Sequence, residues 1–335
     1  MSATQRNLSA KTQHFYAITY TALRAQAAAD LGAQSPEFVA PTQLVEHLIG
    51  RKSQLAKRTW RTYKAAIRAQ LECLLAEGGT TEAPITLQDS QEIRYALQLL
   101  ADEGQKEALR RTNNTSALKA KHIAVDDFQA ICAHLEDLIE GRKVLRGPKS
   151  NLARALLVWC KASDLTGVRP SEWASADLVE YEGVLALKVR NAKNSQGRAN
   201  GEFRHLDLSK LQADEMEAIE QQLELIDGHR DAESFAALQL NMRLFFHRVT
   251  RRVLGKRDRY PSLYTFRHQF SADAKSSGEG RREIAALMGH GSDATAGRSY
   301  AKSKYGRGKV RVAPVAAEVA TVRLKAKQAP LRNPD

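Results

Sequence analysis

The sequence predicts a mainly α-helical protein of two domains with a small β-hairpin sheet in the second one. The chain has 335 residues, which is about twice a typical domain of ~150 residues. Along most of it apolar residues recur at steps of three and four, the spacing of one helix face, and only two short segments have the pattern of strands. A chain of this length buries a sizeable core without disulfides or a metal.

The first domain, residues 1–109, is expected to be helical. Its clearest helix spans residues 57–75, where Trp60, Tyr63, Ile67, Leu71 and Leu74 form one stripe. A second helix is expected at about residues 90–103. Basic side chains lie mostly off the stripe, where they could face a phosphate backbone or simply solvent. These candidate DNA-binding residues are Lys57, Arg58, Arg61, Lys64 and Arg68.

Residues 110–122 are polar and basic and have no consistent apolar stripe. They are therefore interpreted as an interdomain linker. The basic residues Arg110, Arg111, Lys119 and Lys121 are candidate DNA contacts, although linkers are polar in any case.

The second domain is expected over residues 123–310. Short strands are predicted at residues 185–190 and 203–208, because the segment between them is rich in Asn and Gly, as hairpin loops are. The tail, residues 311–335, holds one short amphipathic stretch followed by two prolines. The main helices of this domain are predicted at residues 152–164, 211–226, 234–254, 265–275 and 282–288, the last ending at Gly289.

Charge narrows the class of partner. Lys and Arg number 51 against 38 Asp and Glu, for a formal net charge of +13. Between residues 241 and 311 there are 17 basic against five acidic residues, nearly the whole excess. Such a concentrated field suits a polyanion, commonly DNA or RNA, although a basic run is more often a solvated face.

Other classes are disfavoured by what the sequence lacks. Three cysteines with no CxxC argue against a disulfide framework and a zinc cluster, and no carboxylate cluster suggests a metal. No apolar run approaches the ~18 residues of a membrane span, and the first residues lack a signal peptide's apolar block. We therefore expect a soluble cytoplasmic protein with no membrane partner and no metal or cofactor.

Three short motifs carry candidate chemistry. In residues 165–172, LTGVRPSE, the chain turns at Gly167 and Arg169 is expected at the start of the next helix, a good place for phosphate oxygens. The others are residues 264–268, YTFRH, and residues 288–291, MGHG, with Tyr300 ten residues after His290. Each motif alone is weak evidence for a functional site, because single Arg, His and Tyr side chains are usually solvated or structural.

Taken in order, these motifs resemble the tyrosine recombinase (phage integrase) family over about residues 123–309. The family has an Arg in TGxRxSE, a Lys in a β-hairpin, HxxRH, LGH and a Tyr roughly nine or ten residues later. The matching residues here are Arg169, Lys193, Arg267, His290 and Tyr300. The helical first domain and the basic linker also resemble the family's core-binding domain.

The resemblance implies a site-specific DNA recombinase, an integrase that cleaves and rejoins strands without metal or ATP. Tyr300 would attack a phosphodiester to form a 3′-phosphotyrosyl intermediate, while Arg169, Arg267 and His290 stabilise the phosphate charge. Lys193 would protonate the leaving 5′-oxygen, with Lys188 and Arg198 as nearby competitors.

The resemblance also implies partners and supporting residues. The two domains would close around double-stranded DNA, and four chains would assemble on two sites and exchange C-terminal segments, for which residues 311–335 are the candidate. Glu172 would orient Arg169, unless it is an ordinary surface carboxylate, and His268 would support the site.

The sequence departs from the family pattern at two places. Tyr264 stands where the family has the first His of HxxR; its hydroxyl can donate to a phosphate oxygen but is not a cation at neutral pH. The interval from His290 to Tyr300 is one residue longer than the commonest form, which makes Tyr305 a rival nucleophile. The alternatives are a catalytically silent DNA-binding protein, a type IB topoisomerase and, from charge alone, an RNA-binding protein.

Overall fold

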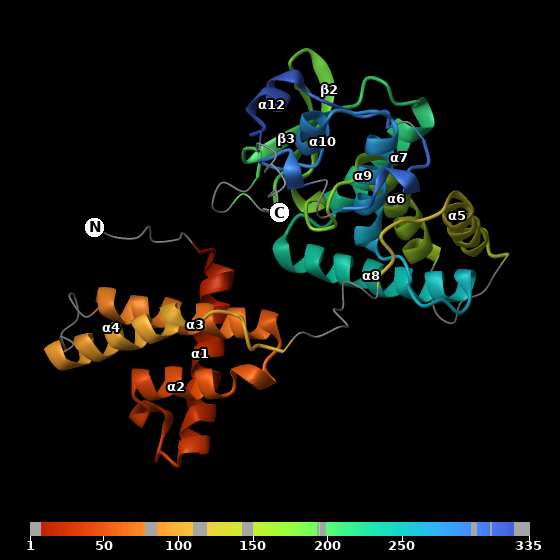
Figure 1. Ribbon diagram of the computed structural model, residues 1–335. Coiled ribbons are helices and arrows are strands. Elements are labelled where there is room, and N and C mark those ends of the chain that lie inside the picture. The colour runs from red at the N-terminus through yellow and green to blue at the C-terminus, as the bar shows by residue number, and fades with distance from the viewer. Residues whose placement is uncertain are drawn as a thin grey trace, which may run out of the picture. The chain divides into compact units, whose positions relative to one another are not determined.

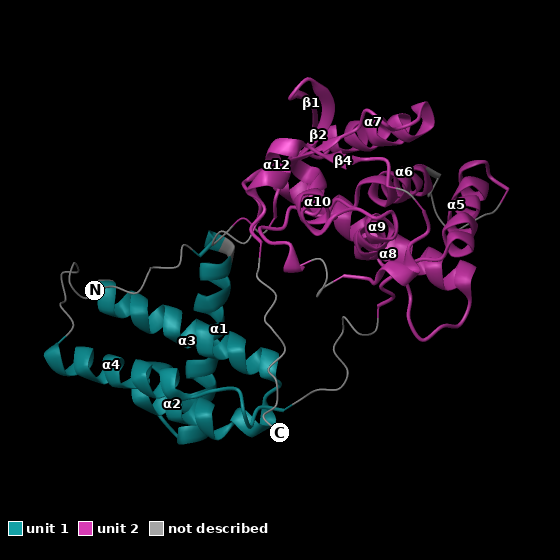
Figure 2. Cartoon of the chain, turned by 45° about the horizontal axis from the view of Figure 1, so that its top comes forward, with its two compact units in different colours: residues 1–114 teal, residues 115–335 magenta. Residues whose placement is uncertain are grey.

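The computed structural model describes residues 8–77, 86–109, 119–142, 150–192, 194, 199–295, 300–308 and 310–324. The chain divides into two compact units, residues 1–114 and residues 115–335 (Figure 2). Their boundary falls inside the stretch that we interpret as a linker. Each unit has its own buried apolar cluster.

The first unit is built from helices, as the sequence predicts (Figure 1). The helix expected over residues 57–75 is confirmed as α3, in which Trp60, Ile67 and Leu71 are fully buried. Gln and Lys side chains of the other face remain at the surface or half-buried. The helices are α1 (Ala10–Leu31), α2 (Pro41–Gly50), α3 (Lys57–Glu77) and α4 (Leu87–Asp102), with short 3-10 turns at Pro36–Phe38 and Lys52–Gln54.

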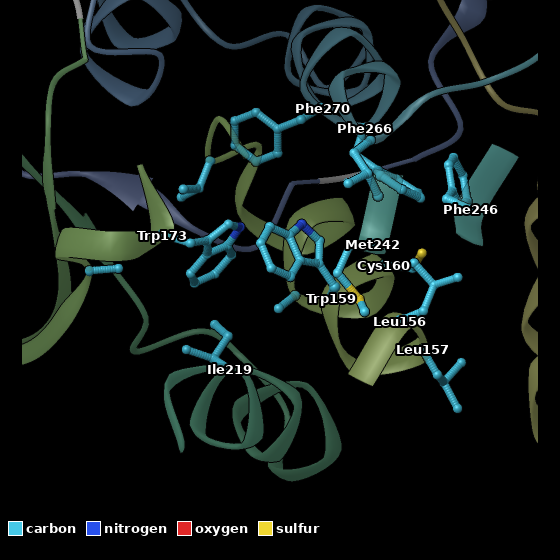
Figure 3. Packing of buried hydrophobic residues seen from close by; sticks show 14 of the residues in the cluster. Leu156, Leu157, Trp159, Cys160, Trp173, Ile219, Met242, Phe246, Phe266 and Phe270 are labelled. Atoms are coloured by element: carbon cyan, nitrogen blue, oxygen red, sulfur yellow. The ribbon is translucent and has the colours of Figure 1, made fainter. Parts of the chain in front are cut away.

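The second unit packs helices around a larger apolar core. Trp159 and Trp173 lie at the centre of this cluster in Figure 3, and both are fully buried. The helices predicted in this unit are confirmed to within two residues or so at most ends. The helices of this unit are α5 (Val125–Ile139), α6 (Ser150–Thr166), α7 (Ala213–Asp227), α8 (Ala232–Leu254), α9 (Leu263–Ser276), α10 (Arg281–Leu287) and α12 (Ala316–Thr321), with 3-10 turns at Trp173–Ser175 and Ser303–Tyr305.

A small antiparallel sheet lies against these helices, with strand order β1-β2-β3-β4. The expected hairpin is confirmed as β2 (Val184–Arg190) and β3 (Phe203–Asp207). Two flanking strands, β1 (Asp177–Tyr181) and β4 (Ala313–Pro314), are additions to that expectation. β1 is joined to β2 by a two-residue turn in which both Glu182 and Gly183 have positive φ. The mainly α class with a small sheet is therefore confirmed.

The C-terminal segment of the described chain docks onto its own unit. β4 pairs with β3, and Val319 and Val322 pack against Ala285 and Ala286 of α10. Glu318 accepts hydrogen bonds from the backbone N–H of His205. Residues 325–335 lie outside the described residues, and exchange of this segment between protomers stays a prediction.

Candidate active site

The turn after α6 brings the first motif into the site. Gly167 has φ +60°, and a Cβ there would lie 2.5 Å from the ring of Phe270, so both conformation and packing require glycine. Our expectation that Arg169 starts the next helix is wrong. The chain instead forms a turn in which the Glu172 N–H donates to the Arg169 carbonyl at 2.8 Å, and it continues into the 3-10 turn Trp173–Ser175. The Glu172 carboxylate accepts the Arg169 backbone N–H at 3.0 Å.

Glu172 is a fully buried carboxylate surrounded by arginines. It accepts a hydrogen bond from the Arg169 side chain and a second from Arg204 Nη2 at 2.7 Å, and Arg267 Nη1 lies 3.8 Å away. Burial alone would raise the pKa of Glu172, but the charges of Arg204, Arg267 and Arg169 outweigh it and hold the pKa far below its ordinary value. Glu172 is therefore ionised and orients Arg169. The contact of Arg204 with Glu172 was not predicted from the sequence.

Helix α9 carries Arg267, whose guanidinium is fully buried. Its Nη1 donates to the Gly167 carbonyl at 2.8 Å and its Nη2 donates to the Met288 carbonyl. These two bonds leave Nε directed at the hydroxyl of Tyr300, 3.2 Å away. Arg267 thus ties the other two motifs together and presents one N–H to the centre of the site.

His290 follows α10 and the left-handed turn residue Gly289, which has φ +60°. Its Nε2 lies 3.3 Å from the Tyr300 hydroxyl. Burial and the nearby charges of Arg267 and Arg169 lower the pKa of His290 far below its ordinary value, so the ring is neutral. A neutral imidazole still offers one N–H donor.

The hydroxyl of Tyr300 is the point where these groups converge. Arg267 Nε, His290 Nε2 and the Tyr264 hydroxyl all lie between 3.2 and 3.3 Å from it. Burial alone would raise the pKa of Tyr300, but the charges of Arg267 and Arg169 and the Arg267 hydrogen bond lower it to about 8. A hydroxyl with a lowered pKa, whose oxygen is surrounded by hydrogen-bonding groups, is typical of an activated nucleophile.

The two support residues on α9 contact the same tyrosine. Burial, followed by the charge of Tyr300, raises the pKa of Tyr264, so this phenol keeps its proton and is the donor to the Tyr300 oxygen when Tyr300 is ionised. The His268 ring packs at 5.0 Å from the Tyr300 ring, and burial followed by the charge of Lys121 lowers the His268 pKa to about 4. His268 is therefore a neutral aromatic neighbour.

A cavity of about 720 Å³ opens beside these residues. Arg169 and Tyr264 line it together with Lys119, one of the candidate linker contacts. Gln239 and Arg243 of α8 also line it, and sequence reasoning missed both because a polar residue at the exposed stripe of a helix carries no signal by itself. The cavity wall thus carries the cations Lys119, Arg169 and Arg243, whose N–H groups suit a polyanion.

Several residues that the sequence suggested for the site make no recorded contact with the Tyr300 hydroxyl or lie outside the described residues. Tyr305 stacks on His122 with ring centroids 4.1 Å apart, and its carbonyl accepts from Gln269. Lys188 lies over the Phe203 ring. Lys193, Arg198, Arg110 and Arg111 lie outside the described residues.

The basic residues of α3 belong to the first unit. Lys57, Arg58 and Arg61 are exposed. Lys64 instead donates to the Glu103 carbonyl at 2.6 Å, and Arg68 lies 3.7 Å from Glu72. Lys64 therefore has a packing role at the end of α4 besides any contact with DNA, and Lys121 is exposed in the second unit.

Within the described residues, no group of three or more His, Cys, Asp and Glu side chains could hold a metal ion. In the same part of the chain, none of the helices combines the length and the apolar character needed to cross a bilayer.

Comparison with known proteins finds solved structures of similar fold at low identity. Lambda integrase, as a dimer bound to a core site, is 13% identical over 90% of each chain, with a TM-score of 0.45. The XerH site-specific recombinase, in a post-cleavage complex with a palindromic difH substrate, is 13% identical over 83% of this chain and 74% of that one, with a TM-score of 0.45. An integrase from mycobacterium phage Brujita is 16% identical over 94% of this chain and 93% of that one, with a TM-score of 0.31. No protein-family model and no curated protein sequence matches this chain.

Proposed function

We propose that this chain is a site-specific DNA recombinase of the tyrosine recombinase family. Tyr300 is the nucleophile and a phosphodiester of double-stranded DNA is the substrate. The observation that carries the proposal is the convergence of Arg267 Nε, His290 Nε2 and the Tyr264 hydroxyl on the Tyr300 oxygen, beside Arg169. Donors so arranged suit an oxyanion, whether the phenolate before attack or phosphate oxygens during it.

The chemistry is a transesterification at phosphorus. The Tyr300 oxygen forms a bond to phosphorus, the bond from phosphorus to the 5′-oxygen breaks, and the electron pair leaves with that oxygen. The five-coordinate state is crowded and negatively charged. Arg169 and Arg267 stabilise this charge and His290 donates to a phosphate oxygen, because positioned donors in a buried site interact strongly with developing charge.

Proton positions follow from the electrostatics of the site. Arg267 and Arg169 favour the Tyr300 phenolate, while Tyr264 stays protonated and donates to it. The leaving 5′-oxygen takes its proton from Lys193, the general acid of our proposal. The product keeps the energy of the phosphodiester in the 3′-phosphotyrosyl bond, so attack by a 5′-hydroxyl reverses the step and ligation needs no ATP.

The DNA is held by both units in this proposal. Lys57, Arg58 and Arg61 of the first unit contact the phosphate backbone, and Lys119 does so near the cavity, where it lines the same wall as Arg169. Four chains assemble on two recombination sites and exchange residues 311–335. The core DNA-binding domain comprises residues 1–109, the linker residues 110–122 and the catalytic domain residues 123–310.

A covalent adduct tests the nucleophile. The full-length protein is first used to enrich bound duplexes from a random-sequence DNA library, and the enriched duplex is nicked so that cleavage releases a short fragment and traps the intermediate. We expect a protein–DNA adduct that survives denaturation and is lost in Tyr300→Phe. The matched control, Tyr305→Phe, removes the hydroxyl of the rival tyrosine that stacks on His122 and should leave the adduct unchanged.

Three results would separate the rivals. An adduct that persists in Tyr300→Phe and disappears in Tyr305→Phe would make Tyr305 the nucleophile. Binding without any adduct would identify a silent DNA-binding protein. Relaxation of supercoiled DNA carrying two copies of the enriched site, with no recombinant product, would identify a topoisomerase.

A further inference from the structure

Arg204 is a fully buried cation that the mechanism above does not use. It lies on β3, with 1% of its side chain exposed. Its Nη2 donates to Glu172 Oε2 at 2.7 Å and its Nη1 donates to Asn191 Oδ1 at 2.7 Å. Burying a guanidinium is costly unless it is paired, so both contacts are needed to hold it there. With its terminal nitrogens so engaged and almost no exposed surface, Arg204 does not reach DNA.

Its first partner leads to Arg169. Glu172 Oε2 is shared between Arg204 and the Arg169 backbone N–H, while Oε1 accepts from the Arg169 side chain and from the Ala192 N–H at 3.1 Å. Rotation of the carboxylate would break contacts to both Arg169 and Ala192. Arg204 therefore restricts the position of Arg169 without touching it.

Its second partner leads to the β2–β3 loop. The Asn191 amide nitrogen donates to the carbonyls of Asn200 and Gly201, at 3.1 and 3.2 Å, and so bridges the two ends of that loop. Arg204 holds the oxygen of the same amide. The described ends of the loop that carries Lys193 are thereby tied to the carboxylate that orients Arg169.

A third element packs directly on this pair. A Cβ at Gly289 would lie 2.0 Å from Asn191 Oδ1 and 3.2 Å from Arg204 Cδ. The glycine is thus needed for close approach as well as for its positive φ. Since His290 is the next residue, the turn that places its ring rests on Arg204 and Asn191.

We propose that Arg204 is a positioning residue that holds Arg169, the base of the β2–β3 loop and the His290 turn in one arrangement. The inference rests on the proposed recombinase activity. Arg204 acts through Glu172 and Asn191 and touches neither the phosphate nor the nucleophile. The forked guanidinium of Arg204 is essential for this role, because the single ammonium of a lysine cannot contact Glu172 and Asn191 in the same geometry.

The test compares leaving groups in single-turnover cleavage. One nicked duplex has the ordinary 5′-oxygen at the scissile phosphate, and the other has sulfur there, which departs without a proton. Lys193→Ala calibrates the assay, because losing the general acid should slow the oxygen substrate far more than the sulfur substrate. The absence of an adduct with the unaltered protein would overturn the proposed function and with it the inference. If an adduct forms but Lys193→Ala slows both substrates equally, Lys193 is not the general acid and the inferred role of Arg204 at the base of the β2–β3 loop is overturned.

Arg204→Met removes the charge and keeps much of the volume. We expect roughly 100-fold slower cleavage of the oxygen substrate at saturating protein, and a ratio of sulfur to oxygen rates about tenfold or more above that of the unaltered protein. DNA affinity should change by less than about threefold. Asn191→Ala removes the contacts to the loop ends and to Arg204 Nη1 but leaves the Arg204–Glu172 pair, and it should raise the ratio in the same direction.

Controls separate positioning from general destabilisation. Arg190→Met changes an arginine of the neighbouring strand that is 63% exposed and pairs with Glu202, and it should behave as the unaltered protein. If Arg204→Met does not fold, Arg204→Lys takes its place with the same expected ratio. A folded Arg204 variant with an unchanged ratio, or with unchanged cleavage, would overturn the proposal.

Discussion

Two groups of basic residues in this molecule differ in environment and should differ in effect. Lys57, Arg58 and Arg61 on α3 are exposed. Arg204 and Arg267 in the second unit are at most 1% exposed and share the carboxylate of Glu172. The net charge of +13 counts both groups alike. Exposed charges act at a distance and are screened by salt, whereas buried charges act over a few ångströms in a weakly screening medium.

Composition therefore predicts a polyanionic partner but does not separate the residues that bind it from those that act in the chemical step. The exposed group should govern affinity and its dependence on salt. The buried group should govern the rate of the chemical step.

The largest effect is expected from Arg169→Ala. Arg169 lies at the cavity beside the Tyr300 hydroxyl, and losing one preorganised donor to developing charge typically costs ~10²–10³ in rate. Cleavage of the nicked duplex at saturating protein should fall by about that factor while DNA affinity changes little. A large loss of affinity with an unchanged rate at saturation would move Arg169 to the binding group.

Tyr264→Phe should lower the cleavage rate by about tenfold or more. The change deletes one hydroxyl donor 3.2 Å from the Tyr300 oxygen, and a donor to a charged group contributes ~1.5–3 kcal/mol. Tyr264→His, which offers an N–H, should remain active. If Tyr264→Phe is silent, the phenol is packing material. If only Tyr264→His is active, the unaltered chain is the silent DNA-binding protein.

The pH dependence should report Tyr300. Its pKa of about 8 lies below the ordinary value, so the phenolate is present above pH 8 and is lost as the pH falls through it. Below that point, cleavage at limiting protein should fall about tenfold per pH unit. The ultraviolet absorbance of phenolate in DNA-free protein should show a matching transition, absent in Tyr300→Phe. His290 and His268 stay neutral there and should add no step. A transition only near pH 10 would contradict the activation of Tyr300.

The smallest effect on chemistry is expected from the exposed group. Replacing Lys57, Arg58 and Arg61 together by Ala should flatten the plot of log affinity against log salt by about one unit per residue that contacts a phosphate. The rate at saturating protein should not change. If the variant with Lys57, Arg58 and Arg61 replaced has the same slope as the unaltered protein, α3 is not part of the DNA interface.

The local structure followed from the sequence where the signal is local. The stripe of Trp60, Ile67 and Leu71 predicted α3, because a helix brings residues three and four apart onto one face. By the same rule Tyr264 and Arg267, three residues apart, share a face of α9, and both reach the Tyr300 hydroxyl. The hairpin of β2 and β3 followed from its loop composition.

The missed features depend on distant contacts. β4 has two residues, one of them proline, and exists because β3 offers an unpaired edge. Asp177–Tyr181 mixes charged and apolar residues without strict alternation, and it is a strand because it pairs with β2. Strand propensity depends strongly on such neighbours.

By itself, the sequence determined the helical class, the hairpin and the order of the residues proposed to be catalytic, since each depends on residues close together along the chain. Only the tertiary structure decided which side chains share the site. Arg267 meets the Gly167 carbonyl across 100 residues, and Glu172 meets Arg204 across 32. Periodicity within one helix carries no information about such pairs. The local sequence around a buried arginine does not differ from that around an exposed one, because burial depends on a charged partner that is distant along the chain.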